Sequence, residues 1–144
     1  MHLDYRLNED RETDWSSVTE EDLRYRVALG NLIFHVGDKD FSADWGWIPL
    51  VDLAASFAEI VRKLESGSPS ETFEFTESDA WVRFEKKGEK VSVSTSYGEG
   101  VAEIALHSAS AAVKSFRERL RSDLDRRHPQ AAHNPAVRKL LGAA

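Results

Sequence analysis

The residues of this chain that could carry out chemistry are few, and their spacing matches no catalytic or metal-binding motif. None of the five histidines stands in HxxxH, HExxH or HxH spacing with another. Asp38, Asp40 and Asp44 lack the third alternating oxygen ligand, the central glycine and the distal glutamate of a calcium loop. The segment SYGEG at 96–100 lacks the lysine and the following helix of a phosphate-binding loop.

The composition excludes further classes of chemistry. The chain has 144 residues and no cysteine, so disulfides, zinc–thiolate sites and thiol catalysis are excluded. No GxSxG nucleophile elbow is present. The sequence therefore favours a protein that is not an enzyme and that needs neither a metal nor a cofactor.

Two segments combine tryptophan with many carboxylates. DKDFSADWGWIPL at 38–50 precedes a predicted helix, and EDRETDWSSVTEED at 9–22 surrounds another tryptophan with acids. One interpretation is structural, because tryptophan often closes the margin of a core and aspartates favour a helix N-terminus. The other is a docking surface, in which an aromatic anchor is ringed by charge. The predicted partner-binding residues are Trp15, Asp38, Asp40, Asp44, Trp45 and Trp47.

Charge is unevenly divided along the chain. Residues 1–80 carry 18 Asp and Glu against 7 Lys and Arg, a net charge of −11, whereas residues 81–144 carry 7 against 12, a net charge of +5. An acidic first half repels phosphate and disfavours nucleic acid as a ligand, so a basic protein is the expected partner. No signal peptide or membrane-spanning stretch is visible, and we expect a cytoplasmic protein that does not associate with membranes.

Periodicity predicts the elements that must position these residues. We expect a single α+β domain over 1–144, with a mainly antiparallel sheet of about six or seven strands and two long helices on one face. The predicted order is β-β-β-α-β-β-β-β-α-α, with an acidic loop at 8–22 and a short C-terminal helix at about 135–142. Period-two alternation over 23–36, interrupted by Gly30-Asn31, predicts a hairpin turning at those two residues. Helical spacing predicts a helix over 48–67, and 71–106 is rich in strands.

The face of the sheet away from the helices offers an alternative site. Alternation places on it a polar, mixed-charge set of side chains together with Trp81, a large aromatic that is unexpected there. The candidate ligand residues on this open face are Arg24, Arg26, His35, Trp81, Arg83 and His107. This surface could serve a small ligand or an enzymatic role, and the same face or a sheet edge could join two copies in a homodimer.

The order of elements, the entry Trp47-Ile48-Pro49-Leu50 to the first long helix, and the small acidic chain without cysteine carry a family resemblance. In these features the chain resembles bacterial immunity proteins of polymorphic-toxin and contact-dependent inhibition systems. The resemblance implies a stoichiometric inhibitor of a basic toxin domain, often a nuclease, whose phosphate-binding cleft would receive the acidic side chains.

Overall fold

The computed structural model describes residues 1–142 and contains eight antiparallel strands in two four-stranded sheets. Sheet A consists of β1 (His2–Leu7), β2 (Leu29–Val36), β3 (Lys39–Asp40) and β4 (Ala43–Pro49). Within it, β2 pairs with all three other strands. Sheet B is a meander of β5 (Ser70–Glu74), β6 (Trp81–Lys87), β7 (Lys90–Thr95) and β8 (Ala102–Ala105).

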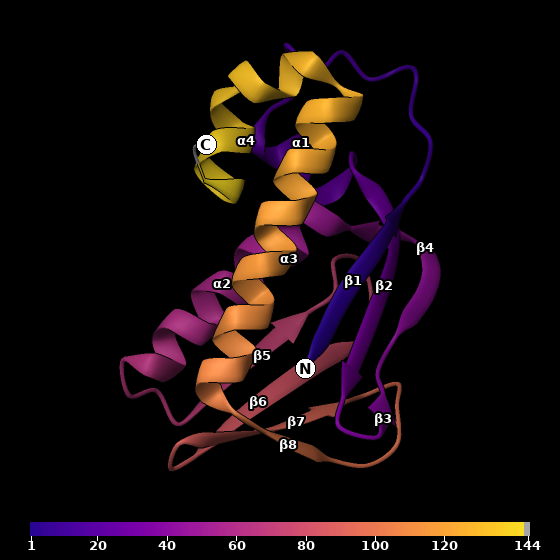
Figure 1. Cartoon of the computed structure of the whole chain (residues 1–144). Helices are drawn as coiled ribbons and strands as arrows, with labels where there is room; N and C mark the ends of the chain where they lie inside the picture. Colours follow the sequence, from indigo (N-terminus) through magenta and orange to yellow (C-terminus); the bar gives the residue numbers. More distant parts are fainter. Residues whose placement is uncertain (143–144) are drawn as a thin grey trace.

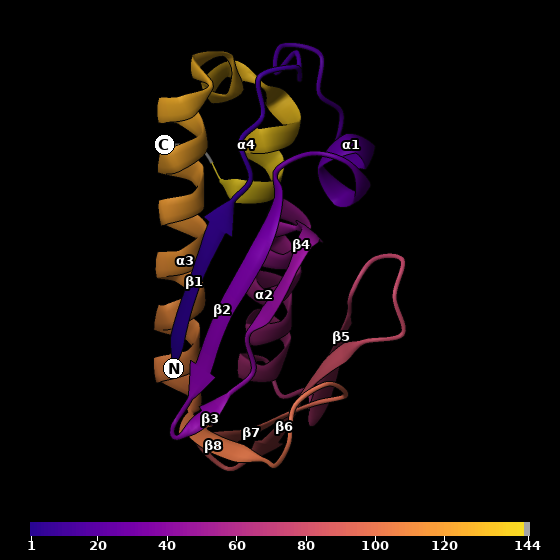
Figure 2. The same cartoon turned by 90° about the vertical axis from the view of Figure 1, so that its right-hand side faces the viewer.

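Two long helices pack together and against the sheets. These are α2 (Leu50–Glu65) and α3 (Leu106–Arg127). Figures 1 and 2 show sheet A along one side of the helix pair and sheet B across the end where α3 begins. At the opposite end lie the short elements α1 (Glu20–Tyr25), the 3-10 helix η1 (Pro129–His133) and α4 (Pro135–Leu141).

Phe57 of α2 joins the two sheets in one core. Its ring lies 5.9 Å from that of Phe34 on β2, 5.3 Å from that of Phe73 on β5 and 5.4 Å from that of Phe84 on β6. All four side chains are buried. They belong to a single cluster of buried apolar residues, which is what a single domain requires.

The prediction of an α+β fold with antiparallel pairing is confirmed, and the predicted helices at 48–67 and 135–142 are present as α2 and α4. The prediction was one sheet of about six or seven strands, whereas the eight strands form two sheets. Helix α2 packs on both of them. The last two residues of the predicted domain lie outside the described residues.

The predicted hairpin over 23–36 is wrong. Its first three residues, 23–25, are the end of helix α1, which begins after Thr19 in a capping box shared with Asp22, and residues 26–28 connect this helix to β2. The acidic loop therefore ends before Glu20, and Tyr25, the last residue of α1, is 49% exposed. The second half is the single strand β2, and the hairpin turn lies instead at Gly37-Asp38, between β2 and β3.

Gly30 has a role other than turning the chain. It sits inside β2 opposite Leu7, and a Cβ at this position would lie 2.0 Å from the carbonyl oxygen of Arg6. Glycine is needed there for close approach of two backbones.

Candidate functional site

The main candidate site is a wide bulge in the edge strand β4, which we call the DWGW bulge (residues 44–47). β4 pairs with β2 at Leu32↔Ala43 and again at Gly30↔Ile48. Four residues of β4 therefore stand opposite the single residue Asn31. Bulges of this kind re-aim side chains away from the ladder and are frequent beside functional sites.

Two asparagine side chains hold the centre of the bulge. Gly46 adopts φ +78°, in the left-handed region that favours glycine. Its N–H donates to Oδ1 of Asn31 at 2.5 Å, and its carbonyl accepts from Nδ2 of Asn8 at 2.6 Å. Both polar groups of the glycine are therefore hydrogen-bonded, which stabilises this backbone conformation of the bulge.

The two tryptophans of the bulge stack on each other over an aromatic base. The rings of Trp45 and Trp47 are 5.3 Å apart with an interplanar angle of 17°. Trp45 is half-buried and meets the rings of Phe75 and Tyr97 edge-on, each at 5.0 Å. Trp47 lies outermost and is 39% exposed. The bulge thus presents one indole to solvent and supports it with another.

Three exposed carboxylates lie in the segment that leads to this aromatic stack. Asp44 is exposed within the bulge, and Asp38 is exposed at the turn between β2 and β3. Asp40 is also exposed and accepts a hydrogen bond from the Ser42 N–H at 2.9 Å. Hydrogen bonds from Ser42 hold the pKa of Asp40 below its ordinary value, so this carboxylate keeps its charge.

Tyr97 connects Asp40 to the aromatic stack. Burial, and after it the negative charge of Asp40, raises the pKa of Tyr97 well above its ordinary value. The phenol therefore stays protonated and donates to the carbonyl of Phe41 at 2.7 Å. Sequence reasoning missed Tyr97, Asn8 and Asn31, because the first lies in another strand's loop and no local pattern links the two asparagines to Gly46.

Trp15 is not part of an exposed site. It is 2% exposed and stacks on His128 with ring centroids 4.9 Å apart. The carboxylates beside it hold local structure: Asp10 accepts from the N–H groups of Glu12 and Thr13, and Asp14 accepts from the N–H of Ser16. The prediction that Trp15 is an exposed anchor is therefore wrong.

The alternative open-face site is only partly assembled. Trp81 and Arg83 do share the outer face of sheet B, where the guanidinium carbon of Arg83 lies 4.5 Å from the centroid of the Trp81 ring. The other predicted members lie on other elements. Arg24 is on α1 and Arg26 is the C-cap residue that follows it. His107 is in the first turn of α3, and His35 is on β2, with its Nε2 3.4 Å from Oδ1 of Asp40. The six residues do not form a single strand face.

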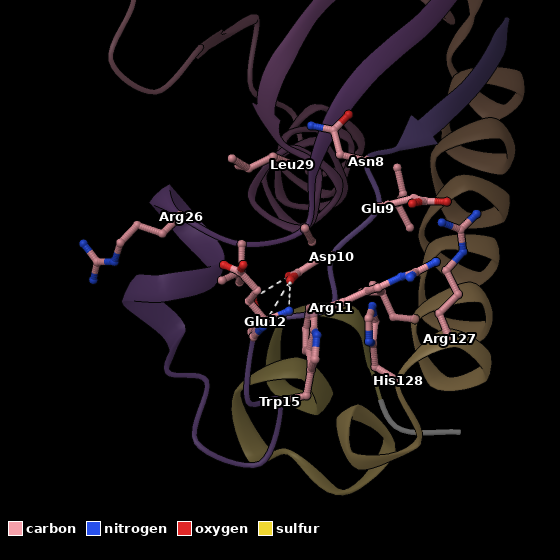
Figure 3. A pocket seen from close by; sticks show the side chains of 15 residues that line it. Asn8, Glu9, Asp10, Arg11, Glu12, Trp15, Arg26, Leu29, Arg127 and His128 are labelled. Atoms are coloured by element: carbon pink, nitrogen blue, oxygen red, sulfur yellow. Dashed lines mark hydrogen bonds between the residues drawn. The ribbon is translucent and has the colours of Figure 1, made fainter.

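A separate cavity of about 670 Å³ lies between the segment 7–13, the residues that lead into β2, and the C-terminal end of α3. Figure 3 shows Trp15 beside His128, with Arg11 and Arg127 on the same side of the cavity and Arg26 pointing away from them. Asp10 is fixed near the centre by its hydrogen bonds with Thr13. Asn8, which holds the DWGW bulge, also lines this cavity.

Comparison of the chain with protein-family models, with curated proteins and with solved structures finds no match in any of the three. Within residues 1–142, no three His, Asp or Glu side chains are grouped so that they could hold a metal ion. Among the helices of the same residues, none combines the length and the apolar character that crossing a membrane requires.

Proposed function

We propose that this chain is a non-enzymatic protein-binding module that docks a basic protein on the DWGW bulge. The observation that carries the proposal is the exposed Trp47, held in place by Trp45 and by the two asparagines that bond Gly46. Tryptophan is enriched among the residues that dominate binding energy. An anchor fixed before binding loses little conformational freedom when the partner arrives, which favours affinity.

The charges in the segment that leads to this anchor indicate the class of partner. Asp38, Asp40 and Asp44 are all exposed in the segment that leads to Trp47. Carboxylates at the rim of an interface attract a partner of opposite charge and raise the rate of association. Because the first 80 residues carry a net charge of −11, the same attraction extends beyond the contact itself.

The narrower form of the proposal is a cytoplasmic immunity protein that neutralises a basic toxin domain. It is supported by the resemblance of the chain to such inhibitors and by the pairing of an aromatic anchor with acidic side chains. A toxin that binds phosphate has a basic cleft, and a surface of this composition is its electrostatic complement.

The test takes the protein encoded beside the gene for this chain as the partner, with binding measured by calorimetry. Trp47→Ala should weaken affinity by about thirtyfold, the loss typical of a dominant interface residue. Asp44→Asn should slow association, most strongly at low salt. Trp81→Ala, on the outer face of sheet B, is the matched control and should bind as the unaltered chain does.

Two outcomes would contradict this proposal. If Trp47→Ala and Asp44→Asn both fold and bind with unchanged affinity, the docking surface is not the DWGW bulge. If Trp81→Ala alone abolishes binding, the surface is the outer face of sheet B, where Trp81 and Arg83 stack. An adjacent gene that encodes no toxin, or a toxin that this chain fails to bind, would reject the narrower form.

A further inference from the structure

We propose that the cavity beside Trp15 is a binding site for a small organic carboxylate with an apolar or aromatic body. This site is separate from the docking surface at Trp47 and does not depend on it. The cavity volume of about 670 Å³ falls within the range of about 300–1,000 Å³ that is usual for small-molecule sites. Its apolar wall is formed by residues that are only half covered by the rest of the protein: Leu7, Val27 and Leu29.

The negative group of the ligand is indicated by Arg11. This side chain is exposed, lines the cavity, and forms no ion pair or side-chain hydrogen bond within residues 1–142. Figure 3 shows it beside the imidazole of His128, which likewise forms no side-chain hydrogen bond within the described part of the chain. The planar guanidinium group matches a carboxylate with two parallel hydrogen bonds.

The overall charge of the lining limits which anions can bind. Three carboxylates and three guanidinium groups line the cavity, so no net positive field draws in every anion: Glu9, Asp10, Glu12, Arg11, Arg26 and Arg127. Recognition has to come from direct contact with Arg11 on one side and from burial of an apolar body on the other. A bare inorganic anion would satisfy only the first of these contacts.

Trp15 supplies an independent observation. Its indole nitrogen is one of two buried side-chain polar atoms without a hydrogen-bond partner in the described residues. An unpaired buried donor costs about 1–3 kcal/mol and requires an explanation. The proposal assigns the missing acceptor to the ligand, which reaches this nitrogen as the lining of the cavity adjusts around it. A carboxylate oxygen placed next to the Trp15–His128 stack would serve as that acceptor.

The test follows the tryptophan indole N–H signals of the ¹⁵N-labelled full chain by NMR during titration with benzoate. Trp15→Phe assigns the Trp15 signal by its loss. Benzoate should shift this signal saturably, and Arg11→Gln should weaken the affinity by about tenfold or more, because it removes a charge-assisted hydrogen bond. Arg138→Gln, an exposed arginine on α4 outside the cavity, is the matched control and should leave the affinity unchanged.

Benzamide and inorganic phosphate are the comparison probes. Benzamide keeps the ring without the charge, phosphate keeps a charge without the ring, and both should bind at least about tenfold more weakly than benzoate. The proposal is overturned if benzoate at tens of millimolar leaves the Trp15 signal unmoved. It is also overturned if Arg11→Gln folds and binds benzoate unchanged, or if phosphate binds as tightly as benzoate.

Discussion

At the scale of single residues, the exposed position of Trp47 depends on Gly46. The left-handed conformation of Gly46 lets β4 leave its ladder with β2 for four residues and return to it. A Cβ at Gly46 would meet no atom closer than 3.9 Å, so the space around the glycine would admit alanine. The cost of a substitution there comes from backbone conformation alone.

We predict that Gly46→Ala lowers the free energy of unfolding by about 1–2 kcal/mol, the cost of a left-handed conformation for a residue with a side chain. If the bulge relaxes to relieve this strain, the NMR signals of the Trp45 and Trp47 indoles shift. Urea denaturation and NMR measure the two effects.

Gly37→Ala is the control for this substitution. Gly37 is also left-handed, with φ +59°, and has open space around it, but it lies in the turn between β2 and β3. It should show a similar loss of stability without the tryptophan shifts. Identical spectra and stabilities for the two variants would show that Gly46 does not determine the shape of the bulge.

At the scale of elements, Asn134 ties the C-terminal helix α4 to the N-terminal loop. Its amide donates to the carbonyls of Trp15 and Val18 at 2.9 and 2.8 Å. Its Oδ1 accepts from the N–H groups of Ala136 and Val137, which caps α4. The side chain is almost fully buried, so each hydrogen bond that is lost leaves a polar group that water cannot reach.

We predict that Asn134→Ala lowers the free energy of unfolding by about 2–4 kcal/mol, because it removes a helix cap and leaves two buried carbonyls without a donor. Asn134→Ser keeps an oxygen that can cap α4 and should show an intermediate loss. Chemical denaturation of the three proteins measures both values. If the alanine and serine variants lose the same free energy of unfolding, the side-chain cap of α4 does not contribute to stability.

Elements with a clear local periodicity of apolar residues could be predicted from the sequence. The apolar stripe of α2 and the alternation of β5 to β8 came from period and turn residues alone. Neighbouring residues could not exclude a hairpin turn at Gly30-Asn31. The glycine is required because the backbone of Arg6, on the paired strand β1, approaches it closely, and the sequence does not show that pairing. The capping box of Thr19 and Asp22 was the local signal that favoured helix α1.

The two acidic tryptophan segments show the limit of composition for predicting a site. Trp15 and Trp47 have similar neighbours in the sequence and opposite exposures. The difference comes from residues far along the chain: His128 stacks on Trp15, and Asn134 bonds its carbonyl. No pattern within either segment contains that information.

At the scale of the whole molecule, Phe57 makes the two sheets stabilise each other. Because its ring packs on both sheets, neither sheet has a separate core to retain when the other unfolds. We therefore expect cooperative unfolding in one transition.

We predict that Phe57→Ala lowers the free energy of unfolding by about 3–5 kcal/mol, the usual cost of truncating a buried phenylalanine. Amide hydrogen exchange should show equal loss of protection in β2 and β6. Two separate denaturation transitions, or a loss confined to one sheet, would show that the sheets are independent units.

Asn8 belongs to both regions that we propose to bind other molecules. Its side chain bonds the carbonyl of Gly46, and the segment around it lines the cavity beside Trp15. An occupant of the cavity that immobilises Asn8 would therefore also immobilise the bulge. Since the coupling free energy between two sites is reciprocal, a protein bound at Trp47 would then raise the affinity of the cavity for that occupant by the same factor. A small molecule in the cavity would in this way change the affinity of the chain for its protein partner, through the side-chain amide of Asn8.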